Sequence, residues 1–105
     1  MAEYRAGPRK RAPSHPGEVV ADILNTLRVS HRQAARHLHV SPMALNNVIS
    51  GKNAVTAKMA LRFGRLFGNG PEIWLNLQRD YDIWHDGQQM KAELAAIEPI
   101  QDTAA

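Results

Sequence analysis

The sequence predicts a single all-α domain of five or six short helices, and three observations support this. The chain has 105 residues, 22% of them charged and 44% hydrophobic, a composition typical of one small globular domain. Apolar residues recur at spacings of three and four between residues 16 and 85, as in amphipathic helices. Pro, Ser, Thr and Gly stand between these segments, where they favour helix ends.

The residue types that are missing exclude several classes of protein. The chain has no cysteine, which excludes a disulfide framework, a thiolate zinc site and a cysteine nucleophile. No apolar run approaches the roughly 18 residues needed to cross a bilayer. The basic N-terminus also lacks the apolar stretch of a secretory signal. We therefore expect a cytoplasmic protein with no membrane partner.

The first helix is predicted after a basic tail. Residues 1–14 combine Pro, Gly, Arg and Ala without periodicity, which predicts a flexible segment. Pro16 suits the first turn of a helix, where its missing N–H costs nothing, and Glu18 and Asp22 suit the positive N-terminal end. The apolar residues that follow at helical spacing predict a helix over residues 16–27. They are Val19, Val20, Ile23, Leu24 and Leu27.

Two shorter helices follow, each with a recognisable start. Ser30 and Gln33 match the S-x-x-Q capping box and predict a helix over residues 31–38. Ser41, followed by proline, begins the next helix in the same way, and Gly51 ends it.

The second half of the chain contains one well-delimited helix, one longer helix and one weak helix. Thr56 precedes a helix over residues 57–67, which ends at a glycine. The sequence Asn-Gly-Pro then breaks the chain and restarts it as a helix over residues 71–85. A last, weakly amphipathic helix is predicted near residues 88–97, before Pro99.

Charge is strongly segregated along the chain. No Asp or Glu occurs between residues 23 and 71, a segment that holds seven Arg and Lys residues. From residue 72 onward, the chain has seven acidic residues and only two basic ones, Arg79 and Lys91. A basic middle and an acidic end indicate two surfaces with different partners, the basic one favouring a polyanion.

Residues 31–50 have the dimensions of a helix-turn-helix. The small Ala35 would let the second helix approach the first closely. The outer face of the second helix then carries only short or amide-bearing groups, namely Met43, Ala44, Asn46, Asn47 and Ser50. Such a face fits the major groove, where Asn pairs with adenine and an apolar group meets a thymine methyl. The alternative is a helical domain whose Asn and Ser residues are simply solvated.

The sequence lacks residue patterns suited to metal binding or to catalysis. His31, His37 and His39 lie close in sequence, but no carboxylate or cysteine accompanies them, so we expect no metal site. The sequence shows no Ser-His-Asp relay and no Gly-rich phosphate loop. We therefore expect neither an enzyme nor a cofactor.

Three segments of the chain resemble a known family. They are HPGEVVADIL, SHRQAARHLHVSPMALNNVISGKNAVTAKMALRFGRLFG and PEIWLNLQRDYDI, which together cover about residues 15–85. These segments resemble the HigA-type antitoxins of bacterial toxin–antitoxin modules, in the branch with an XRE-like (lambda-repressor-like) helix-turn-helix. The resemblance implies a lambda-repressor-like fold and an operator-binding dimer that represses its own operon. It also implies neutralisation of an mRNA-cleaving toxin of HigB type.

The resemblance also implies which residues contact DNA. Base-reading positions of the family fall on His31, Pro42, Met43, Asn46, Asn47 and Ser50. Phosphate-contacting positions fall on Arg32, Lys52 and Asn53. The turn position that the family usually fills with glycine is His39, which must therefore either tolerate a positive φ or alter the turn slightly.

Two further stripes of side chains have more than one interpretation. Trp74, Leu77, Tyr81 and Trp84 share one face of the helix over residues 71–85. We favour a dimer interface over a core position, because aromatic residues are enriched at such contacts. Lys58, Arg62 and Arg65 share a face of the preceding helix and either contact phosphate or are solvated.

These predictions divide the chain into a tail at 1–14, a helix-turn-helix domain with a dimerisation helix at 15–86, and a weak helix and frayed end at 87–105. The expected partners are double-stranded operator DNA with an inverted repeat, a second copy of the chain, and a basic toxin docked on acidic surface. The first alternative is a phage- or plasmid-derived repressor without a toxin. An RNA-binding module is disfavoured, because the outer face of the second helix of the motif carries no stacking aromatic residue.

Overall fold

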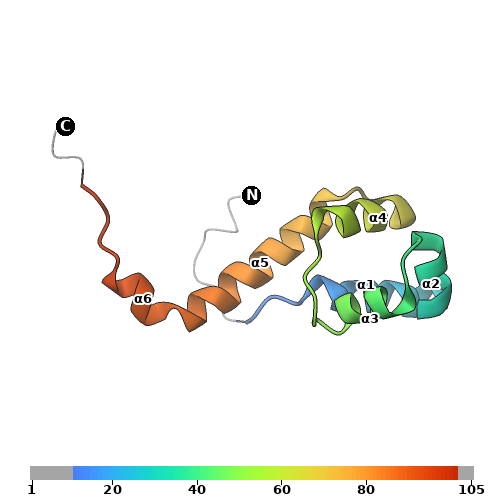
Figure 1. Ribbon diagram of the computed structural model, residues 1–105, viewed down its shortest axis with the longest axis horizontal. Coiled ribbons are helices and arrows are strands. Elements are labelled where there is room, and N and C mark those ends of the chain that lie inside the picture. Colours follow the sequence, from blue (N-terminus) through green and yellow to red (C-terminus); the bar gives the residue numbers. More distant parts are fainter. Residues whose placement is uncertain (1–10, 102–105) are drawn as a thin grey trace.

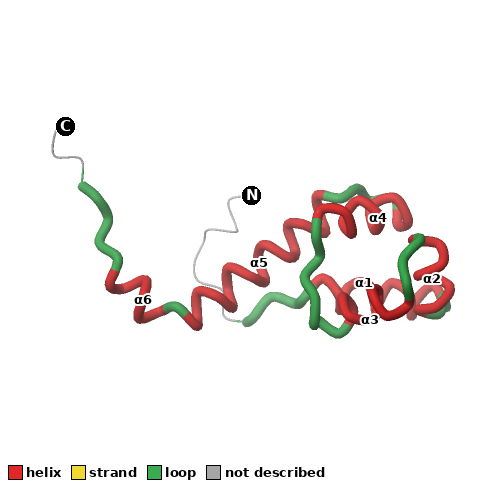
Figure 2. Tube along the Cα trace, viewed as in Figure 1, coloured by secondary structure: helices red, strands yellow, loops and turns green. Residues whose placement is uncertain are grey.

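The computed structural model describes residues 11–101, and in this range the chain is built from helices without strands (Figures 1 and 2). The helices are α1 (Pro16–Leu27), α2 (His31–Leu38), α3 (Pro42–Ile49), α4 (Ala57–Phe67), α5 (Glu72–Gln89) and α6 (Lys91–Ala96). The all-α prediction is confirmed. Most of the predicted basic tail, residues 1–10, and the end of the chain, 102–105, lie outside the described residues.

Side-chain caps fix where the middle helices begin. The Ser30 hydroxyl accepts from the N–H of Gln33 at 3.0 Å, and the Gln33 side chain accepts from the N–H of Ser30 at 2.9 Å, which completes the predicted capping box. Ser41 caps α3 and Thr56 caps α4 through the same hydroxyl-to-N–H contact. The starts of α2, α3 and α4 therefore lie where the sequence places them.

One core joins the first four helices to the beginning of α5. Its buried side chains are Val20, Leu24, Ala34, Ala35, Leu38, Leu45, Val48, Val55, Ala60, Phe63 and Trp74. Trp74 is 1% exposed, stacks near Phe63 with ring centroids 5.2 Å apart, and donates its indole N–H to Asn69 at 3.0 Å. The prediction that Trp74 forms a dimer interface is wrong. The loop before α5 directs the start of this helix back against α4, which places Trp74 in the core.

The second half of α5 and helix α6 form an extension that lies outside the packed helices α1–α4. Helix α5 continues to Gln89, beyond the predicted end at residue 85. Its C-terminal half and α6 project away from α1–α4 (Figure 1), which gives the described chain principal extents of 58 × 27 × 26 Å. All residues of α6 are exposed. No helix of the described part of the chain is long and apolar enough to span a membrane.

Helices α1 and α3 touch through their backbones at Gly17. A Cβ added at Gly17 would lie 2.8 Å from the Ile49 Cα and closer still to the carbonyl oxygen of Val48. Both neighbours are backbone atoms, so a side chain at this position must push α3 away from α1. The glycine therefore sets the distance between these two helices.

We predict that Gly17→Ala lowers the free energy of unfolding by about 1–3 kcal/mol, the usual cost of overpacking. The control is Gly87→Ala in α5, where an added Cβ would meet nothing within 4 Å. That control should raise the free energy by about 0.5–1 kcal/mol, since alanine favours a helix interior over glycine. Urea unfolding monitored by circular dichroism measures both. Equal effects of the two substitutions would contradict the contact.

Candidate nucleic-acid interface

The turn between α2 and α3 holds these helices in a helix-turn-helix arrangement. His39 follows α2 with φ 61° and ψ 42°, so the predicted positive φ is confirmed. The N–H of His39 donates to Arg36 at 3.2 Å, and the N–H of Val40 donates to Ala35 at 3.0 Å. These bonds satisfy carbonyls at the end of α2 and reverse the chain into α3.

The inner face of α3 is buried and its outer face is open. Leu45 is 0% exposed and Val48 is 3% exposed, and α3 packs on both α1 and α2. Most of the residues predicted to read bases are exposed, namely His31, Pro42, Met43, Asn46 and Ser50. Asn47 is only half-buried. The outer face therefore offers amide, hydroxyl, imidazole and thioether groups without an acid.

A second structural feature ties α2 to this face. The Nδ1 of His31, the first residue of α2, lies 3.1 Å from the Oδ1 of Asn46 in α3. The two residues are 15 positions apart in sequence, so the fold brings them together. Arg32, predicted to contact phosphate, follows His31 and is exposed.

The loop after α3 places Lys52 and Asn53 beside that helix. Both residues are exposed, and the N–H of Asn53 donates to the Asn47 carbonyl at 2.9 Å. Farther along the loop, the Val55 N–H donates to the side-chain oxygen of Gln78 at 2.7 Å. Gln78 is 6% exposed, so α5 anchors the loop from inside the protein.

Gln78 was not among the residues predicted from the sequence. The available signal was its spacing of four residues from both Trp74 and Asp82 on one helix. The Gln78 amide nitrogen donates to the Asp82 carboxylate at 2.9 Å, which leaves its oxygen directed at the loop.

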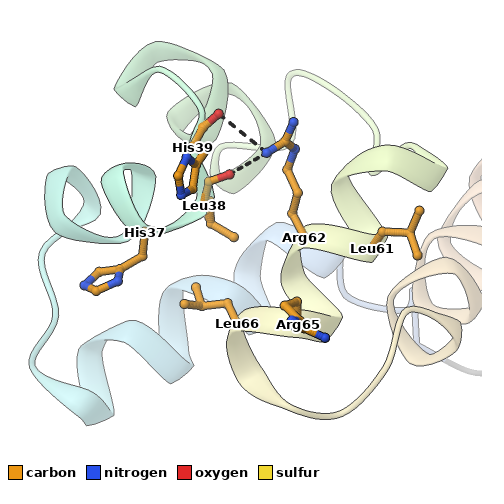
Figure 3. A pocket seen from close by; sticks show the side chains of 7 residues that line it. All are labelled: His37, Leu38, His39, Leu61, Arg62, Arg65 and Leu66. Atoms are coloured by element: carbon orange, nitrogen blue, oxygen red, sulfur yellow. Dashed lines mark hydrogen bonds between the residues drawn. The ribbon is translucent and has the colours of Figure 1, made fainter.

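Arg62 of α4 supports the motif from behind (Figure 3). Its Nη1 donates to the carbonyl of Leu38 at 2.6 Å and lies 3.5 Å from that of His39. A cation at the C-terminal end of α2 is favourable because that end carries partial negative charge. Arg62 therefore holds the turn and is not freely solvated, while phosphate contact by this exposed residue stays a prediction. Arg65 lies beside it in an open depression of about 570 Å³.

Within the described part of the chain, the Arg and Lys residues between 23 and 71 form no ion pair with a carboxylate. Among residues 11–101 the only ion pair joins Arg79 to Asp80, at 3.4 Å in α5. The Arg and Lys residues between 23 and 71 therefore keep their charge available for a polyanion.

No family model matches the chain. Virulence-associated protein A' of Dichelobacter nodosus is 39% identical over 82 residues, which span 77% of this chain and 71% of that protein. An addiction-module antidote protein of the HigA family from Coxiella burnetii is 35% identical with a TM-score of 0.81, covering 86% of this chain and 100% of the other. The Pseudomonas aeruginosa antitoxin HigA, solved with the higBA promoter, is 32% identical with a TM-score of 0.80, covering 85% and 99%. The chain belongs to the HigA-type antitoxins with an XRE-like helix-turn-helix.

In this HigA-type chain the four residues predicted at a dimer interface separate into two groups. Trp74 is in the core, and Leu77 packs against that core. Tyr81 and Trp84 are partly exposed where α5 leaves the body. Large exposed apolar residues near them are Ile83 and Met90.

The histidines of the HigA-type chain do not gather into one cluster within the described residues. Among the described residues, no three His, Cys, Asp or Glu side chains gather closely enough to hold a metal ion. His15, which was not among the residues predicted from the sequence, is 5% exposed and accepts from the Gly17 N–H at 2.9 Å through Nδ1. Its ring lies edge-on to Tyr81, with centroids 4.9 Å apart. It therefore caps α1 and joins it to α5.

The His15 cap depends on a neutral ring. Burial lowers the pKa of His15 below its ordinary value, and the carboxylates of Asp82 and Glu18 oppose part of this shift. His85 also belongs to this cluster, since its ring centroid lies 4.1 Å from that of Tyr81. Because Nδ1 must keep a lone pair to accept from Gly17, protonation there removes the cap.

We predict that stability falls as the pH drops through about 6.5, the ordinary pKa of histidine. The folded state binds this proton more weakly than the unfolded chain does, so unfolding takes up a proton below that pH and not above it. His15→Asn keeps a capping oxygen that does not titrate, and it should reduce the loss between pH 7.5 and pH 5.5. Urea unfolding at both pH values measures the difference, and the other four histidines are common to the two proteins. Identical pH profiles would show that His15 is not the group responsible.

Proposed function

We propose that this chain binds duplex operator DNA through the outer face of α3 and represses its own operon. The observation that carries the proposal is the acid-free, exposed face of α3, flanked by Lys52, Asn53 and the start of α2. The inner face of α3 is buried, so the helix can enter a major groove without unfolding. The P. aeruginosa relative solved with its promoter supports this assignment.

A dimer is the natural form of such a repressor. We propose that two copies pair through the projecting part of α5, where Ile83 is 65% exposed and Trp84 is partly exposed. A two-fold pair would place its recognition helices about 34 Å apart, so the operator should be an inverted repeat. In sedimentation, Ile83→Asp should give monomers, whereas Leu27→Asp, at a similarly exposed apolar residue of α1, should leave the dimer intact.

We further propose that the extension formed by the second half of α5 and by α6, which is acidic, neutralises a toxin of HigB type. A toxin that cleaves mRNA must be basic to hold its substrate, so an acidic surface would attract it. The exposed acidic residues of the extension are Asp86, Glu93 and Glu98. Asp82, by contrast, is engaged by Gln78.

DNA binding should depend steeply on salt, because phosphate contacts release counterions. We predict that Lys52→Ala weakens binding to all duplexes alike and makes the slope of log K against log salt shallower by about 0.9. Lys91→Ala removes the same charge from α6 and should change neither quantity. Fluorescence anisotropy with a duplex from the chain's own upstream region and with an unrelated duplex measures both. Equal, weak binding of the two duplexes by the native protein would overturn sequence-specific repression.

Toxin binding is tested by co-expression with the product of the adjacent gene. We expect the two proteins to co-purify, and we expect Asp86→Lys together with Glu93→Lys to weaken the complex at least about tenfold at low salt. Asp22→Lys on α1 is the control, because it reverses an exposed acid outside the extension. A failure of the intact protein to bind at micromolar concentration would overturn the antitoxin role and leave a repressor without a toxin.

A further inference from the structure

The loop between α3 and α4 is supported by α5 at both of its ends. At the end that leads into α4, the N–H of Val55 donates to the Oε1 of Gln78 at 2.7 Å. At the end that follows α3, the ring of His15 lies beside Gly51, because a Cβ added to this glycine would stand 3.8 Å from the His15 Cγ. His15 in turn lies edge-on to Tyr81, three residues after Gln78 in α5. One stretch of α5 therefore holds the loop from both ends.

The side chains predicted to contact phosphate lie between these two supports. Lys52 and Asn53 are both exposed. The N–H of Asn53 donates to the carbonyl of Asn47 at 2.9 Å, which ties the first half of the loop to α3. Among the described residues, Gln78 makes the only side-chain hydrogen bond to residues 51–55. The second half of the loop is therefore placed by Gln78.

The two ends of the Gln78 amide have different partners, and this assigns the orientation of the amide. The N–H of Val55 can only donate, so the amide oxygen faces the loop. An ionised carboxylate can only accept, so the amide nitrogen faces Asp82, at 2.9 Å. Val55 is 3% exposed and Gln78 is 6% exposed, so the bond between them is shielded from water. A buried N–H without a partner is costly, and the loop is therefore fixed before any duplex arrives.

We propose that Gln78, oriented by Asp82, is a positioning residue for DNA binding. It holds the loop so that Lys52 and Asn53 meet the phosphates beside the groove that α3 enters. Phosphate contacts fix a protein on the duplex but carry no sequence information. Gln78 therefore sets the affinity for every duplex and leaves the preferred sequence unchanged. The inference rests on the proposed binding of duplex DNA.

Gln78→Met tests the inference, because methionine has a similar volume but offers Val55 no oxygen and Asp82 no donor. At about 0.1 M salt we expect about tenfold weaker binding, the scale of one lost phosphate contact. The loss should be the same for the duplex from the chain's own upstream region and for an unrelated duplex. Asn76→Met makes the same exchange at an exposed amide of α5 and should keep the native affinity. Fluorescence anisotropy measures the affinities.

Thermal unfolding by circular dichroism verifies that each variant is folded. If Gln78→Met does not fold, Gln78→Ser takes its place, because serine leaves space for a water molecule to pair with the Val55 N–H. The same loss of affinity is expected, since a water molecule does not anchor the loop to α5.

A double-mutant cycle shows whether Gln78 acts through the loop. Lys52→Ala together with Asn53→Ala removes the two side chains that the loop presents. In that background Gln78→Met should weaken binding by less than about twofold, because the contacts that it loosens are already gone. A residue that only stabilised the fold would cost the same affinity in both backgrounds.

The contact can also be rebuilt with its donor and acceptor exchanged. In Gln78→Glu with Asp82→Asn, the carboxylate at position 78 accepts both from the Val55 N–H and from the amide at position 82. The net charge of the chain stays the same. We expect this pair of substitutions to restore binding, whereas Gln78→Met with Asp82→Asn should remain about tenfold weaker than native.

The outcomes separate this inference from the proposed function. Native affinity in folded Gln78→Met would overturn the inference, and so would a tenfold loss that persists without Lys52 and Asn53. A loss confined to the chain's own duplex would overturn it as well, because Gln78 would then act on base selection. Equal, weak binding of both duplexes by the native protein would overturn the proposed function itself, whatever the variants do.

Discussion

The burial of one face of α3 is the constraint on which the rest of the site depends. Leu45 and Val48 are almost completely inaccessible, and each contributes about 1.5–3 kcal/mol of burial free energy. Together they fix the rotation of α3 about its own axis, so the opposite face must point to solvent. Gly17 then fixes how far α3 stands from α1. The composition of the outer face is free to serve recognition because the inner face alone supports the fold.

Polar contacts at some distance from that face fix its surroundings. Arg62 holds the end of α2, and Gln78 holds the loop that follows α3. His15 holds the start of α1 and lies against Tyr81 of α5. Arg62 and Gln78 reach backbone atoms of other segments, whereas His15 caps its own helix and meets α5 through its ring. These contacts leave the helix-turn-helix few ways to shift relative to α4 and α5. A rigid motif favours selective binding, because less conformational entropy is lost when DNA is bound.

Local sequence signals predicted most of the fold, whereas the contacts of individual side chains could be identified only from the structure. Ser30 with Gln33, Ser41 and Thr56 act on their own neighbours in sequence, so the helix starts could be read directly. His39 was predicted to tolerate a positive φ and does so. The predicted role of Trp74 in a dimer interface was wrong, because helical spacing shows which face of a helix a residue lies on but not what covers that face. Gln78 and the His31–Asn46 pair were missed for the same reason, since their partners lie 23 and 15 residues away.

The central claim, that the outer face of α3 is the DNA-binding surface, is tested most directly by NMR. The ¹⁵N-labelled protein would be titrated with a duplex from its own upstream region while backbone amide shifts are followed. The claim predicts that the largest changes fall at the start of α2, along α3 and in residues 51–54, with α6 unaffected. Changes concentrated in the second half of α5 and in α6, with α3 unchanged, would contradict it.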